Sequence, residues 1–257
     1  MKKLDQHDII NQYRSGIASY KAFTNEVGLW ASEKWCIKRY FKTTDHLLDL
    51  GCGTGRTTFG LWELGYRNLI AVDLTPEMIE SAVAIQTQRK SDIPFQVGDA
   101  TALALETDQF DAVLFSFNGL MSIPGQHNRD NALSEIKRVL KPGGIFLFTT
   151  HDRDEDADYF EFWKAQRERW DRDEQDKRLY EFGDIITTSK NESREIFIHI
   201  PDSKEIETWL HRFNFQVLES FYRIDRFEES EAVKAKSGEC RFWVAQANGI
   251  VDLFQES

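Results

Sequence analysis

Cysteine is scarce in this chain, and long apolar segments are absent. The 257 residues include three cysteines, Cys36, Cys52 and Cys240, which lack the spacing of paired metal ligands. This usage fits a reducing compartment and provides no zinc site. The longest apolar runs have the length of single strands, and none follows the charged N-terminal stretch Met1–Asp8. We therefore expect neither a signal peptide nor a membrane span, and a cytoplasmic protein.

Positive charge is also in short supply. Lys and Arg number 32 against 43 Asp and Glu, which gives a formal net charge of −11. Proteins that dock along a phosphate backbone present basic surfaces, so this balance argues against nucleic acid as a partner. Linkers rich in Pro, Gly or Ser and internal repeats are missing too, so we expect one domain over residues 1–257.

One stretch has the features of a nucleotide site. The apolar run His46–Leu50 predicts a buried strand, and Gly51, Gly53 and Gly55 follow it at alternate positions. Glycines let the chain turn sharply and approach a ligand where a Cβ atom would clash. Apolar residues at helical spacing within Thr54–Leu64 predict a helix whose first N–H groups point back to the loop.

Departures from the phosphate-binding motifs narrow the choice of nucleotide. The dinucleotide pattern G-x-G-x-x-G would need a third glycine where this chain has Arg56, and the Gly-Lys-Ser/Thr of phosphate loops is absent. Asp49, two residues before the first glycine, is a poor neighbour for a pyrophosphate. Its carboxylate could instead receive a cationic ammonium group, directly or through water.

The segment Leu48-Asp49-Leu50-Gly51-Cys52-Gly53-Thr54-Gly55 resembles the first motif of class I S-adenosylmethionine-dependent methyltransferases, and residues 46–151 follow that family's order of elements. The resemblance implies S-adenosylmethionine as cofactor, S-adenosylhomocysteine as product and a methyl acceptor as partner. It also implies that the glycine loop, Cys52 included, contacts the cofactor.

A second acidic residue follows the next predicted strand. Asp73 lies about twenty residues beyond the glycine loop, where a carboxylate can accept hydrogen bonds from both ribose hydroxyls of an adenosine. The alternative is an acid that caps a helix, but Thr75 and Pro76 already supply a helix start. We favour the ribose role and expect Leu74 and Met78 to line an adenine pocket.

Asp99 follows a third predicted strand, Pro94–Val97. The resemblance implies that Asp99 takes the adenine amine and that the N–H of Ala100 binds a ring nitrogen, whereas the alternative is a solvated acid in a turn. Ligands of open parallel sheets bind beyond the carboxyl ends of the strands, where Asp49, Asp73 and Asp99 would all lie.

The N-terminal segment, residues 1–42, predicts two helices with breaks near Ser15-Gly16 and Asn25. In the resembled family such a segment lies over the cofactor. The candidates for contact with the methionine end of the ligand are Tyr13, Tyr20, Trp30 and Lys34. The alternative for each aromatic residue is that it only packs this segment onto the sheet.

The fourth predicted strand and its loop, Phe110–Leu120, should face the transferred methyl group, and we count Phe115 among the cofactor contacts. The loop lacks the Asp/Asn-Pro-Pro-Tyr/Phe of DNA amine methyltransferases and the Pro-Cys of cytosine-C5 enzymes. It is similar to small-molecule members of the family, so we expect a small-molecule acceptor. An RNA or protein methyltransferase, or a non-catalytic module that binds S-adenosyl ligands, is the alternative.

Two histidines are candidates for a general base. His151 follows the fifth predicted strand, Ile145–Thr150, and His127 precedes the fourth predicted helix. His151 could instead hydrogen-bond a neighbouring turn, or join Asp152 and Asn118 in a divalent-metal site. Because a third acidic ligand is not evident, we predict no metal.

Residues 152–200 predict an insert made of a charged, aromatic helix and a hairpin of Gly183–Thr188 with Arg194–Ile200. We expect it to form a lid that excludes water, the alternative being a structural appendage. Residues 201–257 should add a helix and two antiparallel strands to the core of residues 43–151. The predicted fold is α/β and Rossmann-like, a seven-stranded, mostly parallel sheet with helices on both faces, an N-terminal helical segment and an inserted lid.

Overall fold

The computed structural model describes residues 2–154, 159–188 and 194–249. Its main sheet has seven strands in the order β3-β2-β1-β4-β5-β9-β8, all parallel except β9, which runs antiparallel to its neighbours β5 and β8. The strands are β1 (Leu47–Leu50), β2 (Leu69–Asp73), β3 (Phe95–Val97), β4 (Phe110–Phe115), β5 (Leu140–Thr150), β8 (Phe215–Tyr222) and β9 (Arg241–Ala247). The predicted seven-stranded, mostly parallel sheet is confirmed.

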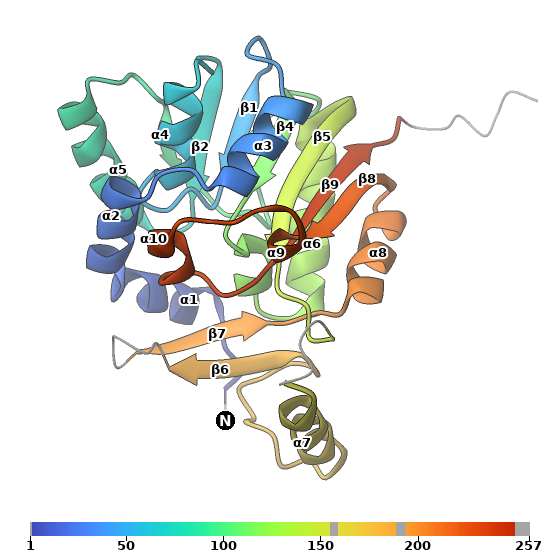
Figure 1. Ribbon diagram of the computed structural model, residues 1–257. Coiled ribbons are helices and arrows are strands. Elements are labelled where there is room, and N and C mark those ends of the chain that lie inside the picture. Colours follow the sequence, from blue (N-terminus) through green and yellow to red (C-terminus); the bar gives the residue numbers. More distant parts are fainter. Residues whose placement is uncertain (1, 155–158, 189–193, 250–257) are drawn as a thin grey trace, which may run out of the picture.

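Helices cover both faces of this sheet (Figure 1). Successive residues of a strand point to opposite faces, so Leu47 and Leu114 pack with one set of helices while Leu48 and Val113 pack with the other. The first set is α2 (Ile17–Glu26), α3 (Ala31–Tyr40), α4 (Arg56–Glu63) and α5 (Pro76–Arg89), and the second is α6 (Gln126–Val139) and α8 (Ser203–Arg212). No helix among the described residues is long and apolar enough to cross a membrane.

The N-terminal segment forms three helices, so the prediction of two was wrong. α1 (Gln6–Arg14) and α2 meet at Gly16, as expected, and the second break lies between α2 and α3, after Asn25, which is still part of α2. Gly28 adopts a φ of 65°, which ends helical geometry, and Trp30 is extended. The carboxylate of Glu33 accepts the Trp30 N–H at 2.9 Å and so caps the new helix.

The insert after β5 contains α7 (Phe160–Asp171) and a hairpin of β6 (Asp184–Thr188) with β7 (Glu195–His199). The predicted hairpin turn, residues 189–193, lies outside the described residues. β7 contacts α1 and the short helix η1 (Gly119–Ser122), which follows β4. Figure 1 accordingly shows the hairpin beside α1, with α7 beyond it. The C-terminal part adds the one-turn helices α9 (Arg223–Arg226) and α10 (Glu231–Lys234) between β8 and β9.

Candidate active site

A cavity lies beyond the carboxyl ends of β1, β2, β3 and β4, and it encloses about 1290 Å³ of empty space, its opening to solvent included. The glycine loop, the ends of these strands, α1, α2 and the segment after η1 supply its wall. The predicted site residues that line the cavity are Tyr13, Tyr20, Gly51, Cys52, Gly53, Asp73, Leu74, Met78, Asp99, Ala100 and Phe115. The strand ends therefore meet where the topology predicts.

The glycine loop has backbone geometry that other residues adopt only with strain. Gly51, Gly53 and Gly55 have φ values of 65°, 55° and 92°. A Cβ atom on Gly51 would lie 2.6 Å from the ring of Phe115, whereas one on Gly53 would meet nothing within 4 Å. Gly55 is not at the cavity wall. It begins α4 and packs on Phe59, so it shapes the loop without facing a ligand.

Asp73 is bound to the glycine loop. One carboxylate oxygen accepts the N–H of Gly53 and the other accepts the N–H of Thr75, each at 2.8 Å. Burial raises the pKa of this carboxyl, and the two backbone hydrogen bonds oppose that effect. A carboxylate has about four acceptor positions, so Asp73 still has acceptor positions for further hydrogen bonds at the cavity wall.

The N-terminal helices cover the cavity through contacts that sequence reasoning missed. Asp99 accepts a hydrogen bond from the Gln6 amide of α1 at 2.7 Å, and the N–H of Thr101 donates to its other oxygen at 2.8 Å. The hydroxyl of Tyr13 lies 2.5 Å from that of Ser122, the last residue of η1. Gln6 is an ordinary polar residue at a helix start, so no local pattern marks it.

A buried ion pair forms another part of the wall. The guanidinium of Arg56 donates to both oxygens of Glu33 at 2.6 Å, and the Ser116 hydroxyl donates to the same carboxylate. Burial by itself would raise the pKa of Glu33, but the charge and hydrogen bonds of Arg56 outweigh it and hold the pKa below its usual value. The pair joins α3 to the start of α4 and to the end of β4.

Trp30 and Lys34 do not reach the cavity wall, contrary to the prediction. The Trp30 ring is buried and lies 4.8 Å from the Arg56 guanidinium, and Lys34 is exposed on the outer side of α3. Trp30 therefore stabilises the buried guanidinium of Arg56 from behind the cavity wall.

Residues 48–148 match the family model described as a methyltransferase domain. These residues form a methyltransferase domain of the class I, S-adenosylmethionine-dependent type. Demethylmenaquinone methyltransferase from Leptospira interrogans is 38% identical over 115 residues, 43% of this chain and 45% of that protein. The eEF1A lysine and N-terminal methyltransferase of Danio rerio is 28% identical over 116 residues, 44% of this chain and 17% of that protein.

A solved structure of a SAM-dependent methyltransferase from Methanosarcina mazei has a TM-score of 0.68 to this chain at 21% identity. The match covers 86% of this chain and 99% of that one, and it shows a shared fold. The chain spans about half the length of the first curated relatives it matches.

In this methyltransferase domain Asp49 lies behind the glycine loop and does not line the cavity. Its carboxylate is 1% exposed and accepts hydrogen bonds from the hydroxyls of Thr57 at 2.7 Å and Thr58 at 2.5 Å, in the first turn of α4. Burial raises the pKa of Asp49 to about 6 against these hydrogen bonds. The structure thus does not bring Asp49 to an ammonium group directly, and its visible contacts fix the start of α4.

His151 has both ring nitrogens engaged away from the cavity of the methyltransferase domain. Its Nδ1 lies 2.7 Å from the carbonyl oxygen of Glu239 and must donate, so its Nε2 accepts from the Asn118 amide at 2.9 Å. Burial lowers the pKa of His151. Asn118 and Phe117 have φ values of 60° and 53°, so His151 supports a strained loop and is not placed to act as the predicted base.

His127 is exposed at the start of α6 and is not at the described cavity wall. The metal alternative does not assemble either, because Asp152 accepts hydrogen bonds from Tyr222, at 2.9 Å, and from Ser203. The described wall of the methyltransferase cavity contains no histidine. Which way a side chain points at a strand end depends on tertiary packing, and this information was missing from the sequence pattern.

Proposed function

We propose that this chain transfers the sulfonium methyl group of S-adenosylmethionine to a small-molecule acceptor by in-line displacement. The observation that carries the proposal is one cavity at which the glycine loop, Asp73 and Asp99 meet a second wall that includes Tyr13, Tyr20, Phe23 and Ile123. The first wall suits an adenosyl ligand, and Tyr13, Tyr20 and Phe23 of the second suit an acceptor. When bound, S-adenosylmethionine supplies the electrophilic methyl group.

The chain's own residues would hold the cofactor by complementary hydrogen bonds. The remaining acceptor positions of Asp73 suit the two ribose hydroxyls, and Asp99 with the Ala100 N–H suits the edge of the adenine. Leu74 and Met78 supply apolar contacts for its ring. Asp73 also accepts the Gly53 N–H, so the ribose contact and the loop conformation depend on one carboxylate.

Proximity and exclusion of water would then drive the transfer, because the described wall lacks a histidine base. Burial raises the pKa of the Tyr13 phenol above its usual value, so Tyr13 stays protonated and can orient an acceptor by a hydrogen bond. Acceptors that are acidic or already nucleophilic fit such a site best.

A small acceptor is favoured by the cover over the cavity. α1 lies across its rim and contacts β7. The space left for an acceptor is therefore bounded by the side chains of one compact cavity. The name of the matched Leptospira interrogans protein points the same way. A protein acceptor, which the name of the Danio rerio relative suggests, is the runner-up. The discriminating assay supplies methyl-labelled cofactor to separated metabolite and protein fractions of a cell extract.

The binding prediction is that the purified chain binds S-adenosylmethionine and S-adenosylhomocysteine but not NAD. The glycine pattern lacks the third glycine of the dinucleotide motif, and Arg56 stands there in a buried ion pair. Isothermal titration calorimetry of all three ligands checks this. Heat of binding with NAD, or with neither adenosyl ligand, would contradict the proposed function.

Asp73→Ala should weaken binding of S-adenosylhomocysteine by about 1.5–3 kcal/mol, which is the scale of lost hydrogen bonds to a charged group. The loss includes the effect on the loop, since Gly53 also loses its acceptor. Asp92→Ala, at an exposed position outside the cavity, is the control. A folded Asp73→Ala protein with the wild-type dissociation constant would remove Asp73 from the ribose site.

A further inference from the structure

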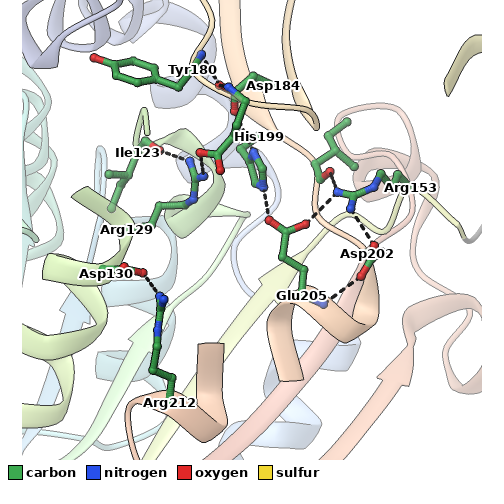
Figure 2. Close-up of polar contacts among 12 residues, drawn as sticks. Ile123, Arg129, Asp130, Arg153, Tyr180, Asp184, His199, Asp202, Glu205 and Arg212 are labelled. Atoms are coloured by element: carbon green, nitrogen blue, oxygen red, sulfur yellow. Dashed lines mark hydrogen bonds and ion pairs between the residues drawn. The ribbon is translucent and has the colours of Figure 1, made fainter. Parts of the chain in front are cut away.

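The insert is joined to the core by buried polar groups (Figure 2). His199 of β7 is fully buried, with Nδ1 2.8 Å from Asp184 of β6 and Nε2 2.9 Å from Glu205 of α8. Carboxylates only accept hydrogen bonds, so each of these contacts requires a proton between the two partners. His199 therefore joins both strands of the hairpin to a helix of the core.

A second set of hydrogen bonds connects the insert with the cavity wall. Arg129 of α6 is fully buried, and its guanidinium donates to the carboxylate of Glu181 in the insert. The same guanidinium donates to the carbonyl oxygen of Ile123 at 2.8 Å, and Ile123 lines the cavity. Figure 2 shows these contacts of Arg129 beside those of His199. One buried cation thus connects the insert with the proposed acceptor wall.

A third set of hydrogen bonds connects the two ends of the insert. Arg153, where the chain leaves β5, donates to Asp202 at 2.7 Å and to Glu205 at 2.9 Å, where the chain enters α8. Its guanidinium also donates to the carbonyl oxygen of Ile200 at 2.7 Å, and its N–H donates to that of Pro201 at 3.0 Å. The two ends of the insert are therefore held together.

These groups do not need a cation to be satisfied. Glu181, Asp184 and His199 offer ligand atoms within 4.8 Å of one another, as a metal site would. The Arg129 guanidinium already neutralises Glu181, however, and the second oxygen of Asp184 accepts the N–H groups of Tyr180 and Glu181 at 2.8 and 3.1 Å. The carboxylates of the cluster are therefore already paired within the protein.

We propose that the insert is fixed to the core beside the cavity and does not open as a lid, and that Arg129 is the positioning residue that holds Ile123 in the cavity wall on the acceptor side. Opening the hairpin would separate buried charged partners, which is strongly unfavourable. The polar contacts of α1 with the rim are weaker: those of Gln6 with Asp99 and Arg14 with Glu77 are exposed, and the half-buried hydroxyl pair of Tyr13 and Ser122 carries no charge. Ligands therefore pass on the α1 side. The acceptor assignment of this wall rests on the proposed function; its rigidity does not.

Hydrogen exchange of the full chain, with and without S-adenosylhomocysteine, tests the proposal. We expect the amides of β6 and β7 to exchange within about tenfold of those of the edge strand β8 in both states, and the amides of α1 to slow at least fivefold with the ligand. A hairpin that exchanges more than a hundredfold faster than β8, and becomes protected only with ligand, would establish a moving lid and overturn the proposal. Failure of ligand binding would count against the proposed function, and the comparison of β6 and β7 with β8 would still stand.

Arg129→Met tests the positioning role, because methionine is long and apolar but cannot donate to Glu181 and Ile123. We expect exchange at Ile123 and in the hairpin to rise at least tenfold, with affinity for S-adenosylhomocysteine within twofold of wild type. Arg212→Met is the matched control, since Arg212 pairs with Asp130 on the exposed side of the same helices (Figure 2). Unchanged exchange in a folded Arg129→Met protein would refute the role of Arg129. If that variant does not fold, Arg129→Lys is measured instead, with faster exchange at Ile123 expected and wild-type exchange again refuting the role.

Discussion

Replacing Glu33 with alanine is expected to lower the free energy of unfolding by about 3–5 kcal/mol, because it leaves the buried guanidinium of Arg56 without its carboxylate. Glu33 is fully buried and Arg56 nearly so, and two parallel hydrogen bonds of 2.6 Å join them. Ser116 and the Trp30 N–H would lose their acceptor at the same time. Urea denaturation at neutral pH measures the change.

Two further variants show whether the isolated charge causes the loss. The double variant Glu33→Leu with Arg56→Met should recover most of the stability, because no buried charge is then left unpaired. Glu63→Ala removes an exposed partner of Arg89 and should change stability by less than about 1 kcal/mol. If Glu33→Ala and Glu63→Ala had the same free energy of unfolding, the buried ion pair would not contribute to stability.

Asp49→Asn is expected to make the protein more stable relative to wild type as the pH rises, by about 3 kcal/mol between pH 4 and pH 8. Burial raises the pKa of Asp49 from 3.8 to about 6, so the folded state binds this proton more tightly than the unfolded state. The stabilising contribution of that proton is complete below about pH 4 and is lost as the pH rises through about 6. Asparagine carries no charge to bury, and its oxygen can still accept from Thr57 and Thr58.

Denaturation of wild type and Asp49→Asn across this pH range checks the linkage. Asp111→Asn is a control of opposite sign: burial would raise the pKa of Asp111, but Lys141 and the N–H of His46 hold it below its usual value. That charge stabilises the folded state above the ordinary carboxyl range, so Asp111→Asn should lose stability relative to wild type as the pH rises. Parallel profiles for wild type and Asp49→Asn would show that Asp49 titrates normally.

Local patterns in the sequence predicted the sheet and the cofactor half of the site. Apolar runs that end in Gly51, Asp73 and Asp99 determine both strand and strand end, and parallel pairing brings those ends together. The same logic could have placed Asp49. It shares the period-two face of Leu47, which packs on the α4 side of the sheet, so its side chain had to point toward that helix.

Pairs that depend on packing of distant segments were not predictable. Glu33 and Arg56 belong to different helices. In the sequence, Arg56 is notable only because it occupies the position of the third glycine in the dinucleotide motif. His151 does follow β5 as expected, but its direction is set by the Glu239 carbonyl from the C-terminal segment. No periodicity or spacing reports such a contact, which explains why the predicted base was misplaced while the strand was not.

The position of β9 has a consequence for how the chain folds. β9 lies between β5 and β8 and pairs with β5 from Ile145 to Thr150. During synthesis the glycine loop and strands β1 to β5 emerge first, while β5 presents an unpaired apolar edge until residues 241–247 are made. A fragment that ends at His151 would keep that edge open and would be prone to aggregate. The cofactor half therefore depends on β9 to complete its sheet.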